Sequence, residues 1–124
     1  MKFTLKFELA AGDLDRATAW YSDVLGLEPI DPDGEALVYR VGGTVFGIYP
    51  SENAGTNNAT AVRLVVDDFD VARAELLSKG VAFEDYDFGP DFRTVDGVLT
   101  SPDGERTSWF KDSEGNILAL GSSL

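Results

Sequence analysis

The 124-residue sequence contains no cysteine and no histidine. Without cysteine the protein can form no disulfide, and it has no thiol nucleophile and no zinc–thiolate site. Without histidine it lacks the commonest general base and the commonest transition-metal ligand, so a Ser-His-Asp triad is excluded as well. The two absences remove the usual residues of nucleophilic catalysis and of zinc binding.

Basic residues are also scarce, because 10 lysines and arginines face 22 acidic residues and give a net charge of −12. A surface of that sign repels phosphate backbones, so a nucleic-acid partner is not expected. Solubility or adaptation to salt is one reading of the acidity, and attraction of cationic ligands is the other.

No apolar run approaches the length that spans a membrane, so no membrane partner is expected. The first ten residues alternate between apolar and polar types and include Lys2, Lys6 and Glu8. This pattern predicts a strand rather than a signal peptide. A cytoplasmic location follows as the default expectation.

The chain contains two internal sequence repeats. Asp13–Tyr21 (DLDRATAWY) returns at an offset of 55 as Asp68–Leu76 (DFDVARAEL), and the sequence PDGE at 32–35 returns at an offset of 70 at 102–105. One domain of two modules is therefore predicted, with module one at 1–50, a polar linker at 51–58 and module two at 59–121. The change in offset places an insertion in module two at about 82–96.

Each module shows one helix and several strands. Asp13 is a predicted helix N-cap, a helix from there ends at Gly26, and strands are expected at 1–10, 27–30, 36–41 and 44–49. In module two, Asp67 or Asp68 caps a helix that ends at Gly80, and strands are expected at 61–66, 98–100, 106–111 and 117–120. The predicted fold class is α+β, with two tandem βαβββ modules.

Three stretches carry a family resemblance: DLDRATAWYSDVLGLEP, DDFDVARAELLSKGV and the closing WFKDSEGNILAL. They resemble the vicinal oxygen chelate superfamily, which includes glyoxalase I, extradiol dioxygenases, fosfomycin resistance enzymes and bleomycin resistance proteins. The resemblance implies two βαβββ modules that form a curved mixed sheet around a cavity, commonly in a homodimer. Since this fold supports several chemistries, the resemblance alone does not fix the function.

The metal-dependent members of that superfamily place His, Gln or Glu ligands at four positions, on the first and last strand of each module. The corresponding residues here are Lys6, Gly47, Ala61 and Ala119. An ammonium group cannot ligate a metal, and glycine and alanine offer no donor side chain. The sequence therefore predicts no metal site and no cofactor.

Seven residues are candidates for ligand binding. Lys6, Glu8 and Arg63 either hold a polar ligand or form a mutually neutralising ion-pair cluster. Tyr39 and Trp109, related by the offset of 70, are either pocket walls or core residues. Tyr86 and Phe92 belong, with Phe83 and Phe88, to the aromatic insertion, which is either a lid or a dimer contact.

The favoured function is a metal-independent protein that binds or sequesters a small organic ligand, as bleomycin resistance proteins do. The alternatives are a metal-free lyase or isomerase that uses Lys6 or Glu8, and an interaction module with a degenerate cavity. The expected ligand is anionic or carbonyl-bearing; a cationic ligand would require Asp85, Asp87 or Asp91 to turn inward.

Overall fold

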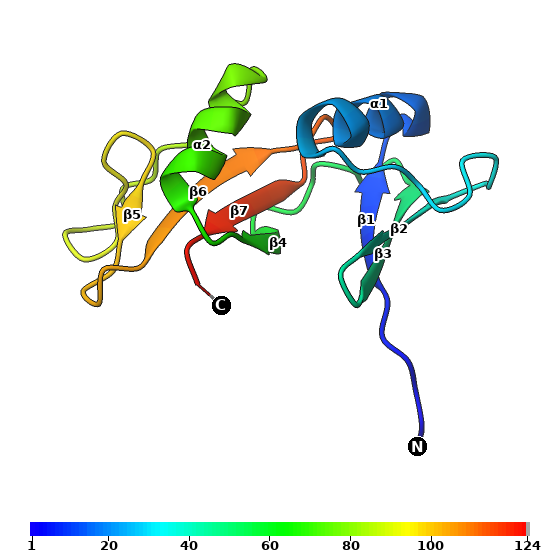
Figure 1. Ribbon diagram of the computed structural model, residues 1–124, viewed down its shortest axis with the longest axis horizontal. Helices are drawn as coiled ribbons and strands as arrows, with labels where there is room; N and C mark the ends of the chain where they lie inside the picture. The colour runs from blue at the N-terminus through cyan, green and yellow to red at the C-terminus, as the bar shows by residue number, and fades with distance from the viewer. Residues whose placement is uncertain (124) are drawn as a thin grey trace. The chain divides into compact units, whose positions relative to one another are not determined.

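A computed structural model of the protein describes residues 1–123, which fold into two compact units (Figure 1). Unit 1 comprises Met1–Asn57 and the short turn Asp112–Asn116, and unit 2 comprises Asn58–Lys111 and the chain from Ile117 on. Neither helix within residues 1–123 has the length and apolar character that a membrane crossing needs.

Unit 1 is a three-stranded mixed sheet with one helix. Its elements are β1 (Phe7–Ala11), α1 (Leu14–Leu25), β2 (Leu37–Val41) and β3 (Thr44–Pro50). The strand order is β1-β3-β2, in which β3 runs parallel to β1 and antiparallel to β2. Helix α1 packs its buried face, Ala17, Tyr21 and Val24, on one side of this sheet (Figure 1).

Helix α1 begins and ends where the sequence predicts. Asp13 accepts a hydrogen bond from the backbone amide of Arg16 at 3.0 Å, which satisfies one of the unpaired donors of the first turn. At the other end Gly26 adopts a left-handed conformation (φ 68°) that glycine tolerates without strain. The local signals of capping therefore determine both boundaries of α1.

Unit 2 repeats this architecture with one strand more. Its elements are β4 (Thr60–Val65), α2 (Phe69–Ser78), β5 (Leu99–Thr100), β6 (Arg106–Lys111) and β7 (Ile117–Gly121), in the order β4-β7-β6-β5. In both units the first strand lies at the sheet edge, parallel to the last strand. The predicted α+β class with two corresponding modules is confirmed.

The N-terminal strand is shorter than predicted. β1 begins at Phe7, and residues 1–6 form no strand, so Leu5 and Phe7 are exposed rather than packed on α1. The register pairs Phe7 with Phe46, and β3 begins only at Thr44. The first residues of the chain therefore have no strand opposite them, whatever their alternation indicates.

Two further boundaries differ from the prediction. No strand is present at 27–30, where Ile30 donates a single backbone hydrogen bond to Val38 at 2.7 Å. Helix α2 has its C-cap at Lys79, and the left-handed Gly80 (φ 88°) follows directly after it. Leu77 is 48% exposed, because it lies beside the narrow apolar stripe of Phe69 and Leu76.

Candidate functional site

The unit-2 sheet has one face covered by α2 and a second face, termed the open face, on which Arg63 is exposed and Trp109 half-buried although Ala119 between them is buried. Successive residues of a strand point to opposite faces, so buried Phe110, Leu118 and Leu120 share the covered side. The strand register places Arg63 opposite Ala119 and Ala119 opposite Trp109. These three residues therefore form one row across the sheet, on the face away from α2.

Arg63 lies at the β4 end of this row. Its guanidinium group lies over the backbone of Gly121, where any larger residue would displace it, and its Nη2 donates to Thr107 Oγ1 at 3.1 Å. None of the five ion pairs found within residues 1–123 includes Arg63. Among residues 1–123, no carboxylate forms an ion pair with this positive charge on the open face.

Trp109 lies at the other end of the row and forms the wall of a pocket of about 190 Å³. Its indole nitrogen donates to Thr60 Oγ1 at 3.0 Å, which fixes the plane of the ring. Tyr86 and Phe92 approach it with ring centroids at 5.5 and 6.1 Å. The other residues that line the pocket are Asn58, Ala59, Phe88 and Ile117.

The insertion after α2 is folded so that its rings reach this pocket. Thr94 accepts a hydrogen bond from the Tyr86 backbone amide and donates to Asp85, both at 2.8 Å, and Asp85 also accepts from the Gly97 amide at 2.8 Å. The Asp87 carboxylate accepts from the Gly89 amide at 3.2 Å. Oδ1 of each of these two carboxylates therefore accepts hydrogen bonds from the loop itself.

Arg73 on α2 holds both ends of the insertion. Its guanidinium lies over the Phe83 ring, 4.7 Å from the centroid, and donates to the backbone oxygen of Asp96 at 2.6 Å.

The Tyr86 hydroxyl belongs to the same insertion. Burial and the charge of Glu84 raise its pKa above the usual value of 10.0, so the group stays a neutral donor.

Lys6 and Glu8 lie in unit 1 and pair with one another. The Lys6 Nζ and Glu8 Oε1 atoms are 3.2 Å apart, and the lysine side chain lies over Gly47. Both side chains are more than 40% exposed, which makes the pair a weak one. Of the two alternatives, Lys6 and Glu8 form the mutually neutralising ion pair in this structure. A role for them in ligand binding stays a prediction.

Tyr39 and Trp109 are not structural equivalents. Tyr39 is fully buried in unit 1, stacked on Phe46 with centroids 5.0 Å apart, whereas Trp109 is half-buried on the open face of unit 2. The residue of unit 2 that shares the Tyr39 position is buried Phe110, at an offset of 71. A shift of one residue moves a side chain to the other face of a sheet, which explains the difference.

The residues at the family's four metal positions do not fit a metal ion. The Lys6 ammonium group lies over Gly47 in unit 1, and in unit 2 the side chains of Ala61 and Ala119 carry no donor atom. Within residues 1–123, no group of three or more His, Cys, Asp or Glu side chains has a metal-binding arrangement. The site therefore offers an arginine and aromatic rings rather than ligands for a metal.

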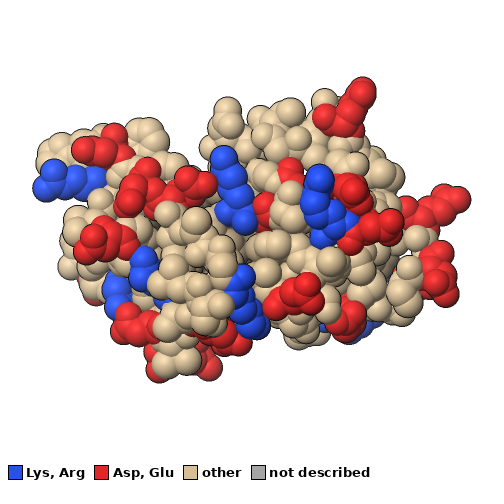
Figure 2. Space-filling view, turned by 90° about the horizontal axis from the view of Figure 1, so that it is seen from above, with Lys and Arg blue, Asp and Glu red and all other residues tan. Residues whose placement is uncertain are grey.

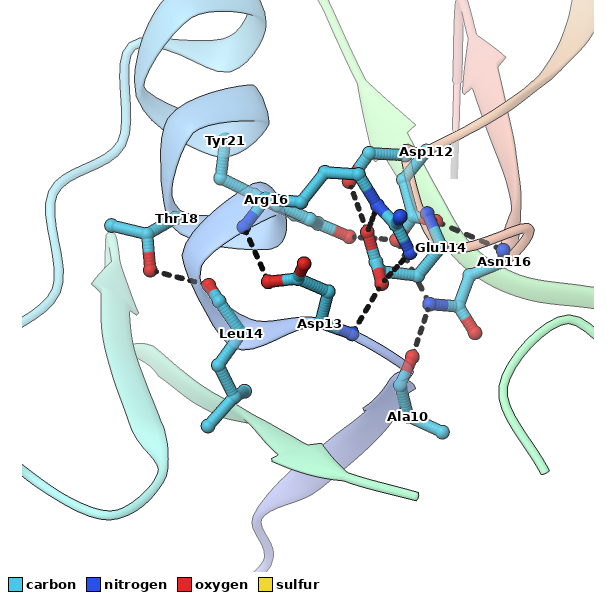
Figure 3. Close-up of polar contacts among 10 residues, drawn as sticks. Ala10, Asp13, Leu14, Arg16, Thr18, Tyr21, Asp112, Glu114 and Asn116 are labelled. Carbon is cyan, nitrogen blue, oxygen red and sulfur yellow. Dashed lines mark hydrogen bonds and ion pairs between the residues drawn. The ribbon is translucent and has the colours of Figure 1, made fainter. Parts of the chain in front are cut away.

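A second polar cluster, in unit 1, is structural (Figure 3). Asp112 accepts from the Tyr21 hydroxyl at 2.6 Å, and Glu114 forms a two-pronged ion pair with Arg16 at 2.8 and 2.9 Å. Burial and then the nearby Asp112 charge raise the pKa of Tyr21, so its proton remains on the hydroxyl. These groups hold the turn Asp112–Asn116 on α1, and both carboxylates are buried.

Six residues of the site were not among the predicted ligand-binding residues. Thr60 and Thr107 orient Trp109 and Arg63, while Asn58, Ala59, Phe88 and Ile117 line the pocket. Ile117 was accessible from the alternation of strand residues, since it lies two residues before Ala119 in the predicted strand 117–120, and Phe88 belongs to the aromatic insertion that the sequence indicates. Thr60 carried no signal, because its contact with Trp109 spans 49 residues of sequence.

Solved structures similar to this chain share its fold. A glyoxalase/bleomycin resistance protein from Catenulispora acidiphila is 27% identical, with 97% of each chain covered and a TM-score of 0.67. A lactoylglutathione lyase from Agrobacterium tumefaciens is 19% identical over 98% of this chain and 93% of its own, with a TM-score of 0.70.

A third structure is a fosfomycin resistance protein from Listeria monocytogenes, complexed with Mn(II) and dihydroxypropylphosphonic acid. It is 17% identical over 100% of this chain and 93% of its own, with a TM-score of 0.68. A comparison with curated proteins gave no match. A family model matches residues 5–120, and the chain belongs to the Glyoxalase/Bleomycin resistance protein/Dioxygenase superfamily.

Proposed function

We propose that this protein binds a small organic ligand on the open face of unit 2 without the help of a metal ion. The ligand places a carboxylate or carbonyl group on Arg63 and its remaining part in the pocket beside Trp109. The observation that carries the proposal is that the guanidinium of Arg63, which is in no ion pair with residues 1–123, lies in the same row of residues as the pocket wall.

The dimensions of the face agree with a small molecule. Thr107, which contacts Arg63, and Trp109 are two residues apart on β6, which corresponds to about 7 Å along a strand. A pocket of about 190 Å³ is slightly larger than a cavity that holds one benzene molecule. Guanidinium groups bind carboxylates through two parallel hydrogen bonds, which would fix the ligand's orientation.

Binding is favoured over catalysis because of the state of the acid–base candidates. Lys6 and Glu8 neutralise one another in an ion pair whose side chains are both more than 40% exposed, so neither lies in the water-excluded setting that acid–base catalysis uses. Bleomycin resistance proteins, which act by sequestration, are the model for this function within the superfamily.

Replacing Arg63 by glutamine is expected to weaken the binding of small carboxylates at least about tenfold, since a charged hydrogen-bond donor is lost. Gly121→Ala should do the same without changing the charge, because the new methyl group occupies the place of the guanidinium. Lys6→Gln and Gly47→Ala are the matched controls in unit 1. A thermal-shift screen of carboxylates and carbonyl compounds, followed by calorimetry, measures the affinities. If the unit-1 variants lost as much affinity as the unit-2 variants, the assignment of the ligand to Arg63 would be wrong.

We also propose that the protein is a homodimer. Residues 1–7 expose Phe3, Leu5 and Phe7 beside the free edge of β1, and an apolar segment at an open sheet edge favours association with a second copy. Light scattering at micromolar concentration should give twice the monomer mass of 13.4 kDa, and Leu5→Asp should reduce it. A monomer mass for the unmodified protein would contradict this proposal.

A further inference from the structure

We propose that the aromatic pocket of unit 2 binds an alkylammonium group, so that the ligand carries a cationic head in addition to the group held by Arg63. This inference rests on the proposed function and specifies the chemistry of the same site. The rings of Tyr86, Phe88, Phe92 and Trp109 would form the walls around the ammonium head.

Each of the four rings contacts two of the others, so the four are arranged in a ring. Starting from Trp109, the centroid distances are 5.5 Å to Tyr86, 5.9 Å from Tyr86 to Phe88, 5.7 Å from Phe88 to Phe92 and 6.1 Å back to Trp109. All four line the same pocket. Aromatic faces attract cations that lie within about 6 Å of the centroid, and several such faces around one space form the usual receptor for methylated ammonium groups.

The charges of the insertion favour the same ligand. Between residues 82 and 96 the chain carries five carboxylates against one guanidinium, at Glu84, Asp85, Asp87, Asp91, Asp96 and Arg93. Asp85 and Asp87 accept hydrogen bonds within the loop, so their charges remain beside the pocket without filling it. Figure 2 shows acidic side chains spread over the visible face with basic ones between them. Arg73 and Lys111 also contact the insertion, at Asp96 and Glu84, so five carboxylates face three basic groups and the remaining negative charge favours a cation.

The hydrogen-bonding groups of the pocket point to the same conclusion. The Trp109 indole N–H donates to Thr60 Oγ1, so this donor is already engaged inside the site. An anionic group placed among the rings would need several donors to replace its hydration shell, and the rings leave only the Tyr86 hydroxyl for this, whereas a quaternary ammonium group needs none. The two ends of the face therefore select opposite charges, with Arg63 at one end and the rings at the other.

Choline and its uncharged isostere 3,3-dimethylbutan-1-ol separate the cation–π contribution from simple hydrophobic burial. Each is titrated into ¹⁵N-labelled full-length protein, and the indole N–H signal of Trp109 is followed; a Trp20→Phe variant assigns it. We expect choline to bind about tenfold more tightly than the isostere. Equal affinities, or no response of the Trp109 signal to choline, would overturn the inference.

Phe88→Leu provides a variant that keeps the apolar surface and removes one aromatic face. Phe88 is 73% exposed, so the substitution leaves the fold intact, and Phe3→Leu at a similarly exposed site (72%) in unit 1 is its control. Phe88→Leu should weaken choline about threefold and leave the isostere unchanged, since only the cation senses the ring quadrupole. An equal effect on both compounds would contradict the cage.

The two proposals can fail separately. Choline has no carboxylate, so Arg63→Gln should not weaken its binding, whereas that variant should weaken carboxylates. If carboxylates bind through Arg63 and choline does not bind, the cage is wrong and the proposed function stands. If choline binds at Trp109 and Arg63→Gln leaves carboxylate binding unchanged, the role of Arg63 is wrong and the cage stands.

Discussion

Replacing Asp112 by alanine is expected to lower the free energy of unfolding by about 3 kcal/mol. The buried carboxylate accepts four hydrogen bonds, from the Tyr21 hydroxyl at 2.6 Å, from the backbone amides of Glu114 and Asn116 at 2.8 and 2.9 Å, and from the Asn116 side chain at 2.9 Å (Figure 3). Alanine would leave these buried donors without a partner, and each such donor costs about 1–3 kcal/mol.

Chemical denaturation followed by circular dichroism measures this loss. Asp112→Asn, which keeps the shape and part of the acceptor capacity, should be intermediate. Asp70→Ala is the control, because that carboxylate is 75% exposed although it pairs with Arg106 at 2.7 Å; it should change stability by less than about 1 kcal/mol. A similar loss for Asp112→Ala and Asp70→Ala would contradict the structural role assigned to the turn.

Acid should destabilise the protein through Glu114 as the pH falls from about 5 to 2. Hydrogen bonds from Arg16 lower the pKa of the buried Glu114 carboxyl from its ordinary 4.5 to about 2. Because the folded-state pKa is the lower one, the stabilisation is complete above the unfolded pKa and is lost as the pH approaches the folded pKa. The ionised Glu114 carboxylate contributes about 2 kcal/mol to the unfolding free energy, a figure that already allows for screening by solvent around the exposed Arg16 guanidinium.

Urea denaturation of the native protein and of Glu114→Gln between pH 2 and pH 7 isolates this contribution. The amide cannot ionise, so the difference in unfolding free energy between the two proteins should be constant above pH 5 and should shrink below it. A difference that is independent of pH would show that the ionised Glu114 carboxylate does not stabilise the fold.

The helices were predictable because their boundaries depend on nearby residues. Asp13 and Asp68 cap α1 and α2 through the amides three residues later, which the two echoed sequences indicate directly. The strands at 1–10 and 27–30 were predicted less well, because a strand requires a partner at the correct register and alternation alone does not show whether one exists.

Part of the site was predictable from the sequence, and part depended on strand register and on contacts between distant residues. Trp109 was selected as a pocket wall, and Tyr86 and Phe92 as members of an aromatic insertion that is a lid or a dimer contact; all three line one pocket. The repeat offset failed for Tyr39, since the register there differs by one residue from that of the PDGE turns. The cluster around Asp112 was missed because its contacts with α1 and β1 span 91 to 106 residues.

The most direct test of small-molecule binding by unit 2 is an NMR titration of ¹⁵N-labelled protein with the tightest carboxylate from the screen. The Arg63 Nε–H and the Trp109 indole N–H should shift together with one dissociation constant, and Arg63→Gln should weaken that constant at least about tenfold. Shifts confined to unit 1, or an affinity that Arg63→Gln leaves unchanged, would contradict the account.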